Sequence, residues 1–260
     1  MPTANSVPSA VVTAAVLVIG DEILSGRTKD KNIGYIADYL TALGIDLREV
    51  RIVPDVEEEI VQALNALRER YTYVFTTGGI GPTHDDITAD CVAKAFGVPI
   101  SYHPEAVAIL KERMAKTGSE LNEARMRMAR IPEGATLIYN KVSGAPGFWI
   151  GNVIVMAGVP AIMQSMLDEV APKLKTGAKL LSETIRADAK EGDVGTELGQ
   201  IAKANPDVII GSYPFFDEKL GANTNIVVRS RDAARLAQVK AEVEAMLVRV
   251  KAALKSTTVR

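Results

Sequence analysis

The sequence predicts an α/β fold: a three-layer sandwich with a mostly parallel sheet between helices, followed by a small α+β C-terminal domain. Over roughly the first 170 residues, short apolar runs alternate with amphipathic segments of helical spacing. The runs are apolar throughout, which is typical of strands buried on both faces of a parallel sheet. After about Thr176 the pattern changes, so we expect two domains, residues 14–175 and 176–260.

The composition excludes several classes of protein. Hydrophobic residues make up 47% and charged residues 24% of the 260 residues, values typical of a globular chain. The 30 basic residues against 32 acidic residues give a net charge of -2, which argues against nucleic acid as a partner. A single cysteine, Cys91, excludes a disulfide within the chain and a zinc site built from several thiolates.

Residues 1–13 are expected to form a disordered tail before the first strand. The apolar run from Ala10 to Ile19 lacks the positively charged flank of a signal peptide, and Gly20-Asp21-Glu22 follows it in place of a cleavage sequence. At about ten residues, this run is also far shorter than a membrane span. We therefore expect a cytoplasmic protein with no membrane partner.

The elements of the first domain follow from apolar spacing and from the residues that end helices. A first strand is predicted at Ala14–Ile19. The next segment, Asp30–Leu43, has apolar residues at helical spacing, and Gly44 stands where a C-terminal cap belongs. The same patterns predict, in chain order, a strand at Glu49–Val53, a helix after Asp55, a strand at Tyr73–Thr77, a helix from Ile87 to Gly97, helices at Glu105–Lys116 and Glu120–Arg130, short strands at Thr136–Tyr139 and Phe148–Ile150, a strand at Val153–Met156 and a helix from Val159.

The second domain is predicted as a βαββα unit. It lacks a cluster of glycines and acids like that of the first domain, so we expect it to contribute to assembly rather than to chemistry. The predicted elements are a strand at Leu181–Ala187, a helix at Asp193–Ala204, strands at Asp207–Ser212 and Asn225–Arg229, and a helix at Asp232–Ala252.

Glycines and acids follow three of the predicted strands. Gly20-Asp21-Glu22 follows the first strand and Asp55 follows the second. The third strand leads into Gly78-Gly79-Ile80-Gly81-Pro82-Thr83-His84-Asp85-Asp86-Ile87-Thr88. Because ligands of open parallel sheets bind beyond the carboxyl ends of the strands, we expect these residues to form one site.

The loop 78–88 predicts an anion site that also contains a cation. Glycine amides and a helix N-terminus favour phosphate there, but Asp85 and Asp86 are close to it in sequence. At about 5 Å and an effective dielectric constant near 20, each carboxylate repels a phosphate charge by roughly 3 kcal/mol. A helix terminus returns only about 0.3–1 kcal/mol. A cation between them removes the conflict, and oxygen ligands favour magnesium. The alternative is that Asp85 or Asp86 merely caps the helix.

Two further glycine-rich segments complete the candidate site. Asn140–Phe148 is either a plain hairpin turn or part of the site, and Ala157–Pro160 adds a helix N-terminus at the same edge. The chain lacks the Walker ending and the third glycine of the dinucleotide fingerprint. His84 is expected in an exposed loop, His103 at a helix start and Cys91 in the core, so covalent catalysis is not expected.

These segments resemble the molybdopterin-binding (MoaB/Mog-like) domain family, and most closely the N-terminal domain of the CinA competence/damage-inducible proteins. The resemblance covers about residues 14–172 and extends weakly to Gly211-Ser212-Tyr213-Pro214 in the second domain. The matching segments are Gly20–Gly26, Asp30–Asn32, Val53–Asp55, Thr77–Thr88, Asn140, Gly144–Gly147 and Gly158–Pro160.

The resemblance implies a ligand that is a small nucleotide or a pterin phosphate, and a divalent metal, with magnesium preferred. It implies Asp55 and Asp86 as catalytic residues, and the charge conflict in the loop predicts Asp85 with Asp86 as metal ligands. The substrate-binding residues that it implies are Asp21, Glu22, Asn32, Gly78, Gly79, Gly81, Thr88, Gly144, Pro146 and Gly147.

Three functions are compatible with these residues. The first is metal-dependent hydrolysis of a nucleotide pyrophosphate such as ADP-ribose, by a homo-oligomer (dimer or trimer). The second is a molybdopterin-binding or adenylylating protein of molybdenum cofactor biosynthesis, with molybdopterin as ligand. The third is a non-catalytic nucleotide-binding sensor. Two departures from the family bear on turnover: Ala157 stands where the family favours proline, and Ile162 where it often has glutamate.

Overall fold

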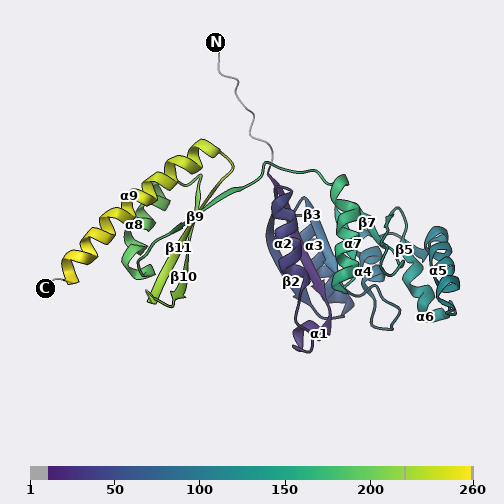
Figure 1. Cartoon of the computed structure of the whole chain (residues 1–260). Coiled ribbons are helices and arrows are strands. Elements are labelled where there is room, and N and C mark those ends of the chain that lie inside the picture. Colours follow the sequence, from purple (N-terminus) through teal and green to yellow (C-terminus); the bar gives the residue numbers. More distant parts are fainter. Residues whose placement is uncertain (1–10, 220, 259–260) are drawn as a thin grey trace, which may run out of the picture. The chain divides into compact units, whose positions relative to one another are not determined.

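The computed structural model describes residues 11–219 and 221–258, and the chain divides into two compact units after Gly177 (Figure 1). Most of the predicted N-terminal tail, residues 1–10, lies outside the described residues. Residues 12 and 13 belong to the first strand, so the strand begins earlier than expected. None of the described helices is long and apolar enough to cross a membrane.

A six-stranded sheet forms the centre of the first unit. In spatial order its strands are β2 (Ile45–Val53), β1 (Val12–Ile19), β3 (Tyr73–Thr77), β8 (Val153–Met156), β7 (Gly147–Ile150) and β6 (Thr136–Ile138). The first four of these are parallel to one another, whereas β7 and β6 run antiparallel to their neighbours. This confirms the predicted mostly parallel sheet.

Helices cover both faces of this sheet and bury alternate residues of the same strand. On β1, Leu17 and Ile19 pack in the core beneath α3 (Glu57–Arg68) and α4 (Thr88–Phe96), together with α5 (Pro104–Thr117). The side chain between them, Val18, packs on the opposite face, in the core beneath α2 (Asn32–Ala42) and α7 (Pro160–Val170). Burying one such aliphatic side chain stabilises the fold by roughly 1.5–3 kcal/mol. Strands that face two cores explain why the apolar runs lack alternation.

The prediction of a helix at Glu120–Arg130 is wrong for most of these residues. The chain forms a single turn, α6 (Glu123–Met126), then a 3-10 turn η1 (Arg127–Ala129) and a short strand β5 (Arg130–Pro132). β5 pairs with β4 (Ile100–Tyr102), a strand that the sequence did not predict. A proline disfavours the helical conformation of the residue before it, so Pro132 holds Ile131 extended. The helix α1 (Asp21–Leu24) was also not predicted.

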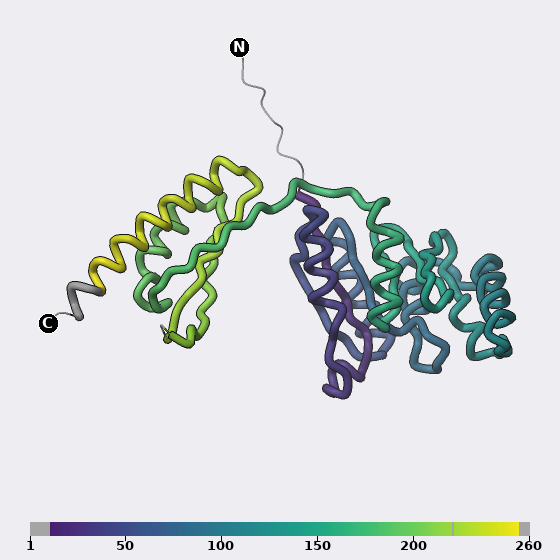
Figure 2. The backbone as a smooth tube through the Cα atoms, viewed as in Figure 1, coloured from purple at the N-terminus to yellow at the C-terminus, as the bar shows by residue number. Residues whose placement is uncertain are grey.

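The second unit has the predicted βαββα order. Its elements are β9 (Leu181–Arg186), α8 (Glu191–Ala204), β10 (Ile209–Asp217), β11 (Gly221–Ser230) and α9 (Ala233–Thr258), and their backbone can be followed in green to yellow in Figure 2. The three strands form an antiparallel sheet in the order β10-β11-β9. Alternate residues of β11, including Ile226 and Val228, pack in one core with Val239 and Val243 of α9.

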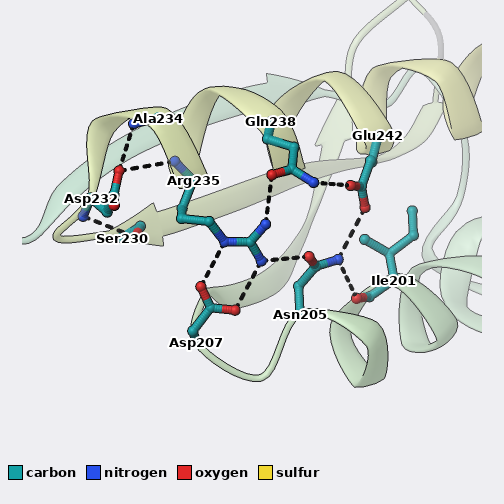
Figure 3. A network of polar contacts seen from close by, with 9 residues as sticks. All are labelled: Ile201, Asn205, Asp207, Ser230, Asp232, Ala234, Arg235, Gln238 and Glu242. Atoms are coloured by element: carbon teal, nitrogen blue, oxygen red, sulfur yellow. Dashed lines mark hydrogen bonds and ion pairs between the residues drawn. The ribbon is translucent and has the colours of Figure 1, made fainter. Parts of the chain in front are cut away.

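A polar network joins the end of α8 to the first turns of α9 (Figure 3). The Arg235 guanidinium donates to both carboxylate oxygens of Asp207, at 2.7 and 2.9 Å, and also to Asn205. Asp232 accepts from the amide of Ala234 at 2.8 Å and so satisfies one of the free donors at the start of α9. These contacts hold the first turns of α9 against the end of α8. The charge of Arg235 is compensated by Asp207 within the network.

Cys91 tests the packing of the first unit directly. Its side chain is wholly buried on α4, and burial raises the pKa of its thiol to about 12. A thiol reagent at about pH 8, near the ordinary pKa of a cysteine, should leave the native protein unmodified. In denaturant it should modify one thiol per chain. Rapid labelling of the native protein would contradict the packing of α4 on the sheet.

Candidate functional site

A cavity of about 490 Å³ lies where the three predicted glycine-rich segments meet. This volume is within the range of small-molecule sites. Its wall includes Gly78–Pro82 after β3, Pro146 before β7 and Gly158 after β8. The sequence is compatible with the second segment being either a plain hairpin turn or part of the site, and the segment lines this cavity through Ser143, Ala145 and Pro146.

Gly78 and Gly79 bring the loop close to its neighbours. Gly78 has φ +102°, and a Cβ at this position would overlap the backbone carbonyl oxygen of Ile19 in β1. Gly79 has φ +66°, and its Cβ would overlap the Thr88 hydroxyl. Both positive φ angles favour glycine, because a residue with a Cβ is strained in this backbone conformation. The two glycines therefore shape the loop as well as line the cavity.

Thr88 shapes this loop from behind. The side chain is fully buried, and its hydroxyl donates to the Gly78 carbonyl oxygen at 3.0 Å. Its amide donates to the Gly79 carbonyl oxygen, also at 3.0 Å. Thr88 therefore holds the loop in shape through these two hydrogen bonds. It was expected to bind substrate, but it does not line the cavity.

Three consecutive amides of the loop are free to bind an anion. Within the described chain, the N–H groups of Gly79, Ile80 and Gly81 donate no hydrogen bond to the protein. The same three residues line the cavity. Successive unpaired amides in a turn are a common cradle for phosphate oxygens. Three free amides in one loop are donors suited to the phosphate that the glycine spacing predicts, and phosphate binding stays a prediction.

Asp86 closes the turn that follows. Its Oδ2 accepts from the Thr83 amide at 2.8 Å and from the Thr83 hydroxyl. The helix α4 begins at Thr88, and Ile87 in the cap position makes no side-chain hydrogen bond to it. The alternative in which Asp86 merely caps this helix is therefore wrong, because the carboxylate accepts from Thr83 and makes no cap hydrogen bond. It lines the cavity beside Gly81, where an added Cβ would lie only 2.6 Å from Oδ2.

The acids that follow separate strands do gather. Asp55, after β2, accepts from the Asp21 amide at 2.9 Å. Burial raises the pKa of Asp55, and the negative charges of Asp21, Glu22 and Asp85 raise it further, against the lowering effect of the Asp21 hydrogen bond. Every charged neighbour that shifts this pKa is a carboxylate. Of this group only Glu22 lines the cavity, and the Asp85 side chain is 61% exposed.

The donor set fits a metal that the ligand helps to hold. No group of three or more His, Cys, Asp or Glu side chains is placed to hold a metal ion among residues 11–219 and 221–258. Magnesium, however, commonly binds one or two protein carboxylates and completes its shell with water and substrate phosphates. The mutual repulsion of Asp55, Asp21, Glu22 and Asp85 is the kind of charge excess that such a cation relieves.

Two buried asparagines hold the remaining glycine-rich segments in place. Asn32 donates to the Gly158 carbonyl oxygen at 2.8 Å, so it acts on the cavity wall from behind. Asn140 accepts from the amides of Ser143 and Gly144 and donates to the Ala145 carbonyl oxygen. The sequence marks Asn140 only as one residue of a family motif, whereas its hydrogen bonds hold residues 140–145 in their turn.

Two predicted glycines are required by the backbone and do not line the cavity. Gly144 has φ +79°, a left-handed conformation that favours glycine. Gly147 lies in β7, where a Cβ would overlap the carbonyl oxygen of Val155. Ile162 and Ala157, the two departures from the family, both line the cavity, so they affect its surface directly.

The sequence missed the basic residues beside the loop. A second hollow of about 380 Å³ is lined by Pro82, His84, Tyr102, Arg127 and Arg130, among others. Arg130 forms an ion pair with Asp90, with two hydrogen bonds of 2.9 and 2.5 Å. The expected helix at Glu120–Arg130 gave no reason to place either arginine near the glycine loop.

Comparison with known proteins agrees with this arrangement. Residues 15–176 match the family model described as a probable molybdopterin-binding domain, and residues 179–253 match the FAD synthase middle domain. A protein of Archaeoglobus fulgidus is 33% identical over 199 residues, which cover 76% of this chain and 84% of the relative. A CinA-like protein of Anaeromyxobacter dehalogenans is 35% identical over 158 residues, 59% of this chain and 39% of that protein.

The crystal structure of CinA from Thermoplasma acidophilum, a protein described as being of unknown function, is also similar. It aligns with a TM-score of 0.58 at 34% identity, over 63% of this chain and 98% of that chain. The match to the family model includes all three glycine-rich segments and covers more than half of the sequence. The chain therefore belongs to the molybdopterin-binding (MoaB/Mog-like) domain family and is a CinA-like member of it.

Proposed function

We propose that the protein binds a nucleotide through its phosphates and hydrolyses a nucleotide pyrophosphate such as ADP-ribose with a divalent metal. The observation that carries the proposal is the row of free amides at Gly79, Ile80 and Gly81, next to a cavity large enough for a nucleotide fragment and beside acids. Phosphate on these amides and a cation among the acids satisfy both charge requirements. The likeness of the second unit to a FAD synthase domain also supports a nucleotide ligand.

The chain's own residues have separate tasks in this reaction. The amides of Gly79–Gly81 hold phosphate oxygens, and their positive ends stabilise the negative charge that develops there. Asp55 lies behind Glu22 and does not line the cavity itself; one of its carboxylate oxygens accepts from the Asp21 amide, and the other would orient the attacking water. Asp85 and Asp86 would hold the metal, which supplies charge neutralisation on the phosphates when bound. Water adds across the P–O–P bond, and ADP-ribose yields AMP and ribose 5-phosphate.

The second candidate is binding or adenylylation of molybdopterin. It is favoured by the apolar part of the cavity wall, where Ile80, Val159, Ile162 and Met166 offer a surface for a flat heterocycle. The family model describes a molybdopterin-binding domain, which supports the same ligand. A sensor without turnover is the third candidate, and the apolar Ile162 at a position where the family often has glutamate supports it.

A turnover screen separates these candidates. The purified protein is incubated with ADP-ribose, FAD or NAD in magnesium, manganese or cobalt, and the products are separated by chromatography. Hydrolysis of ADP-ribose supports the first proposal. Binding of ADP-ribose without product supports the sensor, and binding of molybdopterin with no affinity for nucleotides supports the second candidate.

Removal of the divalent metal by a chelator tests whether hydrolysis depends on it. Hydrolysis should be lost in excess chelator and should return when magnesium is added beyond the chelator concentration, because two acids beside a phosphate need a cation between them. The melting temperature should change little, since the fold does not depend on the acids being neutralised. Full turnover in excess chelator would contradict a metal on Asp85 and Asp86.

A further inference from the structure

Arg127 occupies a position that the reaction above does not use. It lies in η1 and lines the 380 Å³ hollow. It also lines a small void of about 20 Å³ that is shared with Gly79, Gly81 and Asp86. Arg127 therefore borders the same space as the free amides of the glycine loop. This void has room for about one water molecule, so a larger group reaches Arg127 from the hollow.

Arg127 forms no ion pair within the part of the chain that the structure describes, whereas its neighbour Arg130 is paired with Asp90. Its guanidinium makes one hydrogen bond to these residues, from Nη2 to the Asp86 carbonyl oxygen, and it is long at 3.3 Å. Its Nε is buried and has no partner among them. A buried donor on a charged group is costly to leave unpaired, so this edge of the guanidinium is suited to an anion.

The hollow is lined by the two arginines, by one exposed acid, Glu123, and by the rings of Tyr102 and His84, so a phosphate beside Arg127 has an aromatic neighbour. The Tyr102 side chain is 48% exposed there and His84 is almost fully exposed. Pro82 lines both the hollow and the main cavity, so the two spaces are neighbours at this loop. Gly79, Gly81 and Arg127 also line the small void together, so a ligand on the loop amides lies near Arg127.

We propose that Arg127 binds the second phosphate of a diphosphate whose first phosphate lies on the amides of Gly79–Gly81. The inference rests on the proposed function in that the ligand carries a pyrophosphate group. It adds a specificity for two linked phosphates over one, because a guanidinium takes two oxygens of a phosphate in a planar pair of hydrogen bonds.

The test is the affinity for inorganic pyrophosphate and for inorganic phosphate, measured by calorimetry in magnesium. Arg127→Gln should weaken pyrophosphate binding by about tenfold or more, the effect of losing a charge-assisted hydrogen bond, and should leave phosphate binding within about twofold. Arg127→Lys keeps the positive charge, so its affinity for pyrophosphate should lie between those of the wild type and Arg127→Gln. The matched control is Arg125→Gln, on the neighbouring turn α6, which should bind pyrophosphate like the wild type.

The outcomes separate this inference from the proposed hydrolysis. If Arg127→Gln binds pyrophosphate as tightly as the wild type, or if the wild type binds none, the inference is wrong even where ADP-ribose is hydrolysed. If pyrophosphate binding weakens as expected and no nucleotide is turned over, the inference stands and the hydrolase proposal fails. The melting temperature and the protection of Cys91 show that each variant is folded.

Discussion

Gly78→Ala is expected to destabilise the first unit by about 3 kcal/mol or more. The left-handed backbone accounts for roughly 1 kcal/mol of this effect, and the forced overlap with the Ile19 carbonyl oxygen accounts for the rest, because a β1 backbone atom cannot move aside. The loss should appear as a lower midpoint of urea denaturation with an unchanged slope.

Gly34→Ala is the matched control for this change. Gly34 lies inside α2, and a Cβ there meets no atom within 4 Å. Alanine at this position should be neutral or should stabilise the protein by up to about 1 kcal/mol. If the two variants lose similar stability, Gly78 is not held against β1 as the structure shows, and the loop must adopt another conformation.

Asp86→Asn is expected to lower the turnover of ADP-ribose by about a hundredfold or more, which is equivalent to at least about 2.7 kcal/mol of transition-state stabilisation. Asparagine keeps an oxygen that accepts from the Thr83 amide, so the turn should persist and stability should change by less than about 1 kcal/mol. It removes the negative charge that a magnesium ligand needs. The measurement is the steady-state rate and the melting temperature of the same preparation.

Asp38→Asn controls for the loss of one negative charge, because Asp38 is exposed on α2 and outside the residues that line the cavity. Its rate should equal that of the wild type. A large loss of stability in Asp86→Asn with retained specific activity would show that Asp86 acts only through the Thr83 turn, and the metal would then have to be assigned to Asp55 and Asp85.

The order of the elements was predictable because each buried strand leaves a continuous apolar run. The strand Val153–Met156 is buried at every position, and the structure gives it the predicted bounds. The strand β5 was not predictable in this way. Only three residues long, it is too short to show a period, and the apolar residues before it fit a helix equally well.

The candidate site was predictable where glycines and acids follow strands, and not where contacts come from irregular segments. The gathering of Asp55 with Asp21 follows from parallel strands that end at one edge. The role of Thr88 could not be deduced, because its hydroxyl is used on the Gly78 carbonyl, a partner ten residues earlier in the chain. Arg127 reaches the loop only because η1 interrupts what the spacing predicted to be a helix.

Product analysis of ADP-ribose incubated with the wild-type protein in magnesium tests the proposed hydrolysis most directly. We expect AMP and ribose 5-phosphate in equal amounts, formed at a rate that falls about a hundredfold in Asp86→Asn. If the wild type forms no AMP although ADP-ribose binds in the cavity, the protein is not a pyrophosphatase of this substrate. Equal rates in the two proteins would contradict the catalytic role of the acids beside the glycine loop.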